Sequence, residues 1–286
     1  MSNYLIHDNE NDSPLVSVTV EEMIKGLNHL DLMTFKIIAS KGISEEKEAI
    51  QTVIDDLIDE EHICHSKDSV WRSIKSLIIA NLLKSQSIHT GYRRLNILSL
   101  TPAGETVYMK LYRKTPAKSE RERMIANHNS VLHGYMIKDV KTILQSKLGF
   151  TRISTDRKEN TVLLPNGGAC IPDVIAWGSA QPTFFEVECG NHNQEDFDGK
   201  CDRLKQISKK IYFIVRSRSD AKDKLLPQIE RWVQKRRDIL VMNGVKVYLT
   251  TLRDLSNHLI TYIIDPALDE PICRISKRRK EESDNV

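Results

Sequence analysis

Three carboxylates stand at spacings that predict a shared site in the second half of the chain. Asp173 follows a proline in the apolar run 171–177, and Glu186 and Glu188 alternate with apolar residues in the run 184–189. Residues two apart on a strand point to the same face, so Glu186 and Glu188 should point the same way, and Asp173 joins them if the strands pair. Two such charges about 4 Å apart repel by roughly 4 kcal/mol at an effective dielectric constant of about 20. A catalytic site here is therefore expected to hold Mg2+ or Mn2+, and a non-catalytic one no cofactor.

The same three acids also admit a purely structural interpretation. Asp173 after a proline fits a turn at the edge of a strand, and alternation alone would put Glu186 and Glu188 on the solvent face of an edge strand. Phe185 and Val187 make the run apolar on its other face, which favours a central strand. An acidic site is the favoured interpretation, and whether it performs catalysis stays open.

The surrounding pattern predicts the elements that must position these acids. The periodicity predicts a helix from about 131 to 148, ended by Gly149, and then a change to a period of two. Expected strands lie near 150–155, 161–164, 171–177, 183–189, 211–215 and 245–250, with helices over 194–208 and 225–240. This order predicts a mixed sheet with helices on its faces, an α/β arrangement.

Proline-aspartate on one strand and acid-x-acid on the next, within an αβββαβ order, resembles the PD-(D/E)xK nuclease superfamily over about residues 125–250. The resemblance implies a restriction-endonuclease-like domain, here bounded at 117–265, with Asp173 and Glu186 as metal ligands. The superfamily has a lysine at position 188 that steadies the attacked phosphate and the water nucleophile. Glu188 stands there instead, as in some active restriction enzymes, so we expect Glu188 to be catalytic together with a displaced lysine. Lys200 is the favoured candidate for that lysine, and Lys205 is the alternative.

The first half of the chain is patterned as short helices followed by a hairpin. Helices are expected near 20–29 and 31–40, a third after Ser44, and a fourth with apolar residues facing inward. Outward-facing small and basic side chains on the fourth helix suit a DNA groove, and two arginines flank the expected hairpin turn at Gly91. The predicted DNA-binding residues are Ser69, Arg72, Ser73, Lys75, Ser76, Arg93 and Arg94.

The hairpin leads into the phrase Leu98-Ser99-Leu100-Thr101-Pro102-Ala103-Gly104, which predicts a capped helix continuing to Tyr112. Taken with the basic-faced fourth helix, this resembles a bacterial winged helix-turn-helix domain over residues 15–116, an α+β module. A charged linker is expected from Pro116 to Met124.

A narrower resemblance covers the whole chain. His133 with Asp139 six residues later, the proline-aspartate strand, the strand 184–190 and a helix carrying Lys200 resemble the replication-relaxation family of plasmid and conjugative-element proteins. The resemblance implies a DNA-bound role in replication, relaxation or transfer of a mobile element, without deciding whether the acids cut DNA.

Composition and charge bound these possibilities. The 286 residues carry a net charge of +3, but the charges are unevenly distributed. Residues 1–62 include 4 basic and 14 acidic residues, whereas residues 63–160 include 18 basic and 7 acidic residues. A basic central block favours double-stranded DNA as the partner, with other replication or transfer proteins and a second copy of the chain as further expected partners. No apolar run approaches the roughly 20 residues of a membrane span, so we expect no membrane partner and a cytoplasmic location. Residues 266–286 are expected to form a basic, disordered tail.

Three hypotheses remain open on the sequence. The leading one is a DNA-binding protein of a mobile element with a nuclease-fold domain. The second is a Mg2+-dependent endodeoxyribonuclease that uses Asp173, Glu186 and Glu188 with Lys200. The third is a transcriptional regulator with an inactive nuclease-like domain.

Overall fold

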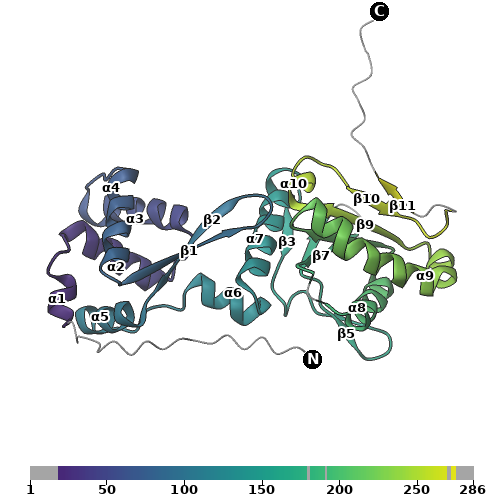
Figure 1. Cartoon of the computed structure of the whole chain (residues 1–286), viewed down its shortest axis with the longest axis horizontal. Helices are drawn as coiled ribbons and strands as arrows, with labels where there is room; N and C mark the ends of the chain where they lie inside the picture. Colours follow the sequence, from purple (N-terminus) through teal and green to yellow (C-terminus); the bar gives the residue numbers. More distant parts are fainter. Residues whose placement is uncertain (1–18, 179–180, 191, 269–271, 275–286) are drawn as a thin grey trace, which may run out of the picture. The chain divides into compact units, whose positions relative to one another are not determined.

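The contacts within the chain divide it into two units, and the boundary is not a single position (Figure 1). The computed structural model describes residues 19–178, 181–190, 192–268 and 272–274. The first unit comprises Met1–Ser85 and Leu98–Ala117, and the second comprises Gln86–Ile97 and Lys118–Val286. The sequence predicts the whole hairpin within a first domain of residues 15–116, but the tip of the hairpin belongs to the second unit. Residues 15–18 of that expected domain lie outside the described part of the chain.

The first unit is a helical core with the base of one hairpin. Its helices are α1 (Val20–Ile24), α2 (His29–Lys41), α3 (Glu46–Glu61), α4 (Lys67–Ile79) and α5 (Pro102–Tyr112). The hairpin strands β1 (Leu83–His89) and β2 (Arg94–Leu100) begin and end in this unit, and their residues from Gln86 to Ile97 belong to the second. Thr19 and Glu22 form the expected capping box, but α1 is shorter than predicted because Asn28 caps α2 and starts it two residues early. Helix α4 packs against α2 and α3 around buried residues that include Phe35, Val53 and Leu77.

A close approach between two backbone segments explains why a glycine, Gly104, follows the hairpin. The Thr101 hydroxyl caps α5 by accepting from the Gly104 N–H at 2.9 Å, and it donates to the Asn81 carbonyl at 2.5 Å. A Cβ on Gly104 would lie 2.1 Å from the Leu82 carbonyl oxygen, a distance that forces the backbone to shift. The start of α5 is thereby held against the turn that follows α4.

Gly104→Ala is therefore expected to destabilise the first unit by about 1–3 kcal/mol, because overpacking typically costs this much. Gly26→Ala is the matched control, since a Cβ there meets nothing within 4 Å. Urea unfolding followed by circular dichroism measures both variants. Equal midpoints would contradict the close approach.

The second unit begins with a helix where a linker was expected. Ser119 and Glu122 form a capping box for α6 (Glu120–His128), so the predicted linker Pro116–Met124 is wrong over its second half. The remaining elements are α7 (Val131–Ser146), β3 (Arg152–Ser154), β4 (Val162–Leu163), β5 (Ala169–Cys170), β6 (Val174–Trp177), β7 (Pro182–Glu188), α8 (Gln194–Ile207), β8 (Lys210–Val215), the π-helix η1 (Asp220–Leu225), α9 (Leu226–Asn243), β9 (Lys246–Thr251), α10 (Leu252–Leu255), β10 (Tyr262–Ile264) and β11 (Ile272–Arg274).

A mixed sheet organises this unit, with the strand order β11-β10-β9-β8-β7-β6-β3. Strands β7, β8 and β9 are parallel, whereas β6 is antiparallel to both β7 and β3. Helix α7 lies on one face of the sheet, and α8 and α9 lie on the other (Figure 1). Their apolar side chains form two separate core clusters with the strands. The expected mixed α and β composition is confirmed. Because β7 lies between β6 and β8, the alternative that its glutamates belong to an edge strand is wrong.

The C-terminal end differs from the expected tail. Residues 272–274 form β11, which pairs antiparallel with β10, so the prediction of a disordered segment from 266 is wrong there. Residues 275–286 lie outside the described part of the chain. Within the described ranges, every helix is too short or too polar to cross a bilayer.

Candidate functional site

Strand pairing brings the predicted acids together. The register that places Val174 opposite Phe185 puts Asp173, the residue directly before β6, beside Glu186. The Asp173 Oδ2 atom accepts from the Val187 N–H at 2.9 Å, which ties the side chain to the neighbouring strand. The Glu186 and Glu188 residues are each only 2% exposed. These acids therefore share one interior-facing site, as their spacing predicted.

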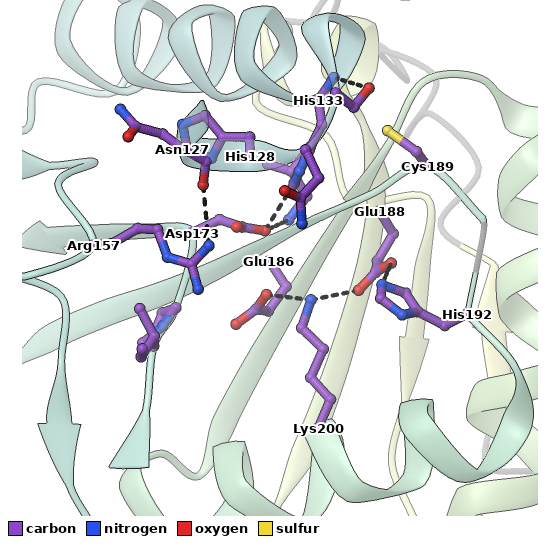
Figure 2. Close-up of a pocket in the computed structure, with 15 residues that line it drawn as sticks. Asn127, His128, His133, Arg157, Asp173, Glu186, Glu188, Cys189, His192 and Lys200 are labelled. Atoms are coloured by element: carbon purple, nitrogen blue, oxygen red, sulfur yellow. Dashed lines mark hydrogen bonds and ion pairs between the residues drawn. The ribbon is translucent and has the colours of Figure 1, made fainter. Parts of the chain in front are cut away.

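A lysine from the following helix lies between the two glutamates. Asn193 caps α8, and this start places Lys200 on the helix face that packs against the sheet. The Lys200 Nζ atom lies 2.5 Å from Glu186 Oε2 and 2.7 Å from Glu188 Oε1 (Figure 2). The alternative candidate, Lys205, is bound instead to Asp202 at 2.7 Å. Lys200 is thus the lysine that reaches the acids.

Two histidines join the site from the junction between α6 and α7. His128 ends α6, and Asn129 turns the chain with a φ of 56°, in the left-handed region that asparagine tolerates. Ser130 then caps α7, so that His133 lies in its first turn. The His133 Nε2 atom lies 3.2 Å from Asp173 Oδ2, and the His128 and His133 rings meet edge to face with centroids 5.6 Å apart.

These groups line a cavity of about 380 Å³ (Figure 2). Arg157 borders it and donates to the Asn127 carbonyl at 3.0 Å. His192 borders it too, with its Nε2 atom 3.4 Å from Glu188 Oε2. A neighbouring cavity of about 610 Å³ is also lined by Arg157 and, in addition, by Arg203. Sequence reasoning did not select Arg157, Arg203 or His192, since isolated basic residues in loops and on helix faces carry no spacing signal.

The environment shifts the pKa values of Asp173 and Glu186, the two candidate metal ligands, in opposite directions. Burial would raise the pKa of Asp173, but the hydrogen bond with His133 and the charge of Lys200 outweigh burial and lower that pKa. Burial raises the pKa of Glu186 well above its usual value; the charge of Lys200 opposes this shift and that of Asp173 adds to it. Two carboxyls with separated pKa values in one cleft are typical of a functional site.

The basic groups are tuned by the same acids. Burial would lower the pKa of Lys200, but the surrounding carboxylates, Glu186 first, raise it well above its usual value. Burial would also lower the pKa of His133, and the hydrogen bond with Asp173 reverses this and raises it. For His128, burial and then the charge of His133 lower the pKa. Lys200 is therefore held as a cation inside the cavity, and His128 as a neutral ring.

Asp139, which accompanied His133 in the sequence motif, has a different role. Its side chain is 1% exposed and accepts from the Thr90 hydroxyl at 2.6 Å and from Arg93 Nε at 2.7 Å. The tip of the hairpin, around Gly91, also comes close to the Arg216 carbonyl. That Arg93 contacts DNA stays a prediction: its Nε atom donates to Asp139, and its side chain is 33% exposed. Arg94 remains exposed, with its Nε atom donating to the Ser87 hydroxyl at 2.8 Å.

Asp139→Ala is expected to lower the free energy of unfolding by about 2–3 kcal/mol, because it leaves Thr90 and Arg93 without this acceptor. Arg94→Ala is the control and should change stability by less than about 0.5 kcal/mol, as exposed substitutions usually do. Chemical denaturation of the full chain compares them, and equal stabilities would contradict a structural role for Asp139.

The predicted DNA-binding face of α4 is only partly exposed. Arg72 and Lys75 are exposed, with the Lys75 ammonium 5.1 Å from the centre of the Trp71 ring. Ser69 and Ser76 are half-buried. Ser73 is 3% exposed, because it lies three residues after Val70 and four before Leu77, both of which are buried. The outward orientation predicted for Ser73 is wrong.

Comparisons of the chain with protein-family models, with curated proteins and with solved structures find no match.

Proposed function

We propose that this chain binds double-stranded DNA through its first unit and cleaves DNA with a divalent cation at the pocket of its second unit. The observation that carries the proposal is the convergence of Asp173, Glu186, Glu188 and Lys200 in one buried pocket. We assign the first unit to the winged-helix class and the second to the PD-(D/E)xK type. The resemblance to replication-relaxation proteins supports a setting in replication, relaxation or transfer of a mobile element.

The donor set fits a divalent cation. Asp173, Glu186 and Glu188 bring carboxyl groups into the same cavity as Lys200, and a bound cation would favour the ionised form of Glu186, which burial disfavours. Carboxylate oxygens are the ligands that Mg2+ prefers, and Asp173 and Glu186 are the pair that would hold it. A bound cation would polarise a phosphoryl oxygen and lower the pKa of a bound water.

Lys200 takes the role of the lysine that the PD-(D/E)xK superfamily has at the position of Glu188. Its ammonium is fixed at 2.7 Å from Glu188 Oε1 and lines the cavity, so it is preorganised to stabilise negative charge on a phosphate. Glu188 holds that ammonium in place. Arg157 and Arg203 add positive charge at the border of the two cavities, which favours an anionic substrate.

The experiment incubates supercoiled and linear DNA with the full chain in Mg2+, in Mn2+ and in a chelator. We expect metal-dependent nicking that Asp173→Ala abolishes and that Asp223→Ala, a change at an exposed aspartate of η1, retains. Absent nicking, or nicking that survives Asp173→Ala, overturns the cleavage proposal. DNA binding without nicking would support the accessory protein, and promoter effects without effects on plasmid maintenance would support the regulator.

DNA binding by α4 has its own test. The double change Arg72→Ala and Lys75→Ala should weaken DNA affinity and reduce the log–log slope of affinity against salt by about 0.9 for each lost phosphate contact. Lys41→Ala removes a cation that lies 2.6 Å from Asp56, within the acidic part of the same unit, and should leave the slope unchanged. Fluorescence anisotropy at several salt concentrations measures both. An unaltered slope in the double variant would exclude α4 from the DNA backbone.

A further inference from the structure

The histidines at the junction of α6 and α7 present ligand atoms that converge on Asp173. One ring nitrogen each of His128 and His133 and one carboxylate oxygen of Asp173 lie within 4.8 Å of one another. Figure 2 shows the three side chains gathered at one side of the cavity, with Lys200 between its glutamates at the other. Two ligands of a tetrahedral ion, each about 2.0–2.1 Å from it, are roughly 3.4 Å apart. The 3.2 Å between His133 Nε2 and Asp173 Oδ2 fits that spacing.

The backbone holds these ligands in place through its own capping geometry. Asn129 in the left-handed region ends α6 directly after His128, and the Ser130 cap then sets the first turn of α7 with His133. The Val187 N–H fixes Asp173 Oδ2 from the other side.

We propose that His128, His133 and Asp173 bind one first-row divalent metal ion of the zinc type, with a fourth position open to the cavity. Imidazole nitrogens select such ions, whereas Mg2+ prefers oxygen ligands. Two histidines and one carboxylate with an open position are also the ligand set of catalytic rather than structural zinc sites. This inference does not rest on the proposed nuclease function, although Asp173 is common to both.

The experiment titrates the full chain with Co2+ alone, without DNA, and follows the visible absorption of bound Co2+. All proteins carry Cys64→Ser, so that this exposed thiol does not bind the ion. We expect one Co2+ per chain, displaced by Zn2+ and not by excess Mg2+. His128→Ala and His133→Gln should each weaken binding by more than about 10-fold. His192→Gln, which changes a histidine of the same cavity outside the ligand set, should keep wild-type affinity.

Three results would overturn the site. They are a Co2+ affinity of His128→Ala equal to that of the wild type, displacement of Co2+ by Mg2+, and loss of Co2+ binding in His192→Gln but not in the ligand variants. X-ray absorption of the zinc-loaded wild type is a check that needs no variant, and fewer than two imidazole ligands would also overturn it. Glu186→Gln separates the two proposals, because it should retain Co2+ binding while losing DNA cleavage. Wild-type Co2+ binding without cleavage would refute the nuclease proposal and support this one.

Discussion

Replacing Lys200 with methionine is expected to lower the free energy of unfolding by about 3–5 kcal/mol and to abolish DNA cleavage. The ammonium is the cation that lies between Glu186 and Glu188, each 2% exposed. Methionine fills a similar volume but leaves these carboxylates buried without their partner, and breaking a buried ion pair costs this much. The same change removes the positive charge that, in our proposal, stabilises the negative charge of the attacked phosphate.

Lys205→Met is the matched control for that change. Lys205 lies on the same helix but is paired with Asp202 away from the pocket. Denaturation in a chelator isolates the effect on folding, and cleavage assays in Mg2+ measure the effect on activity. A Lys200→Met protein that equals Lys205→Met in both would refute the role of this lysine.

Glu186→Gln is expected to act in the opposite direction on stability while also abolishing cleavage. Burial raises the pKa of Glu186, which means that the ionised side chain destabilises the metal-free fold at neutral pH. The glutamine has the shape of the glutamate but carries no charge. The ion pairs of Lys200 with Glu188 and of His133 with Asp173 are retained in this variant. We expect a gain of about 1–2 kcal/mol in a chelator, as happens when a functional residue is traded for stability.

Thermal unfolding with and without Mg2+ measures this second effect. Added Mg2+ should stabilise the wild type by binding the folded state, and it should have little effect on Glu186→Gln. Glu230→Gln, a change at an exposed glutamate of α9, is the control for removing one charge. A variant that is less stable than the wild type in chelator would mean that Glu186 is a structural acid.

The strands of the site could be predicted because their signals are local. Alternation places Glu186 and Glu188 on one face of β7, and pairing with β6 requires only that neighbouring strands meet. The buried orientation of Ser73 could also be predicted, since Ser73 stands at helical spacing from Val70 and Leu77. The prediction that it points outward is wrong because the small, polar residue type says less about burial than the position in the helix.

The remaining parts of the site depend on where helices begin and end. Lys200 reaches the glutamates only because Asn193 starts α8 at one register, which spacing alone does not distinguish from a register that favours Lys205. His128 meets His133 because Asn129 adopts a left-handed turn that few sequence patterns specify. The role of Asp139 depends on residues 46 and 49 positions earlier, and periodicity cannot show such long-range contacts.

The interleaving of the two units along the chain has a consequence for its biosynthesis. Thr90 leaves the ribosome 49 residues before Asp139, the acid to which it is bound in the finished fold. At roughly 5–20 residues per second this separation corresponds to about 2–10 s, during which the hairpin tip has no partner in α7. A fragment that starts at Lys118 would never acquire that partner, so the second unit should fold poorly when it is expressed from that position and recover when residues 86–97 are supplied.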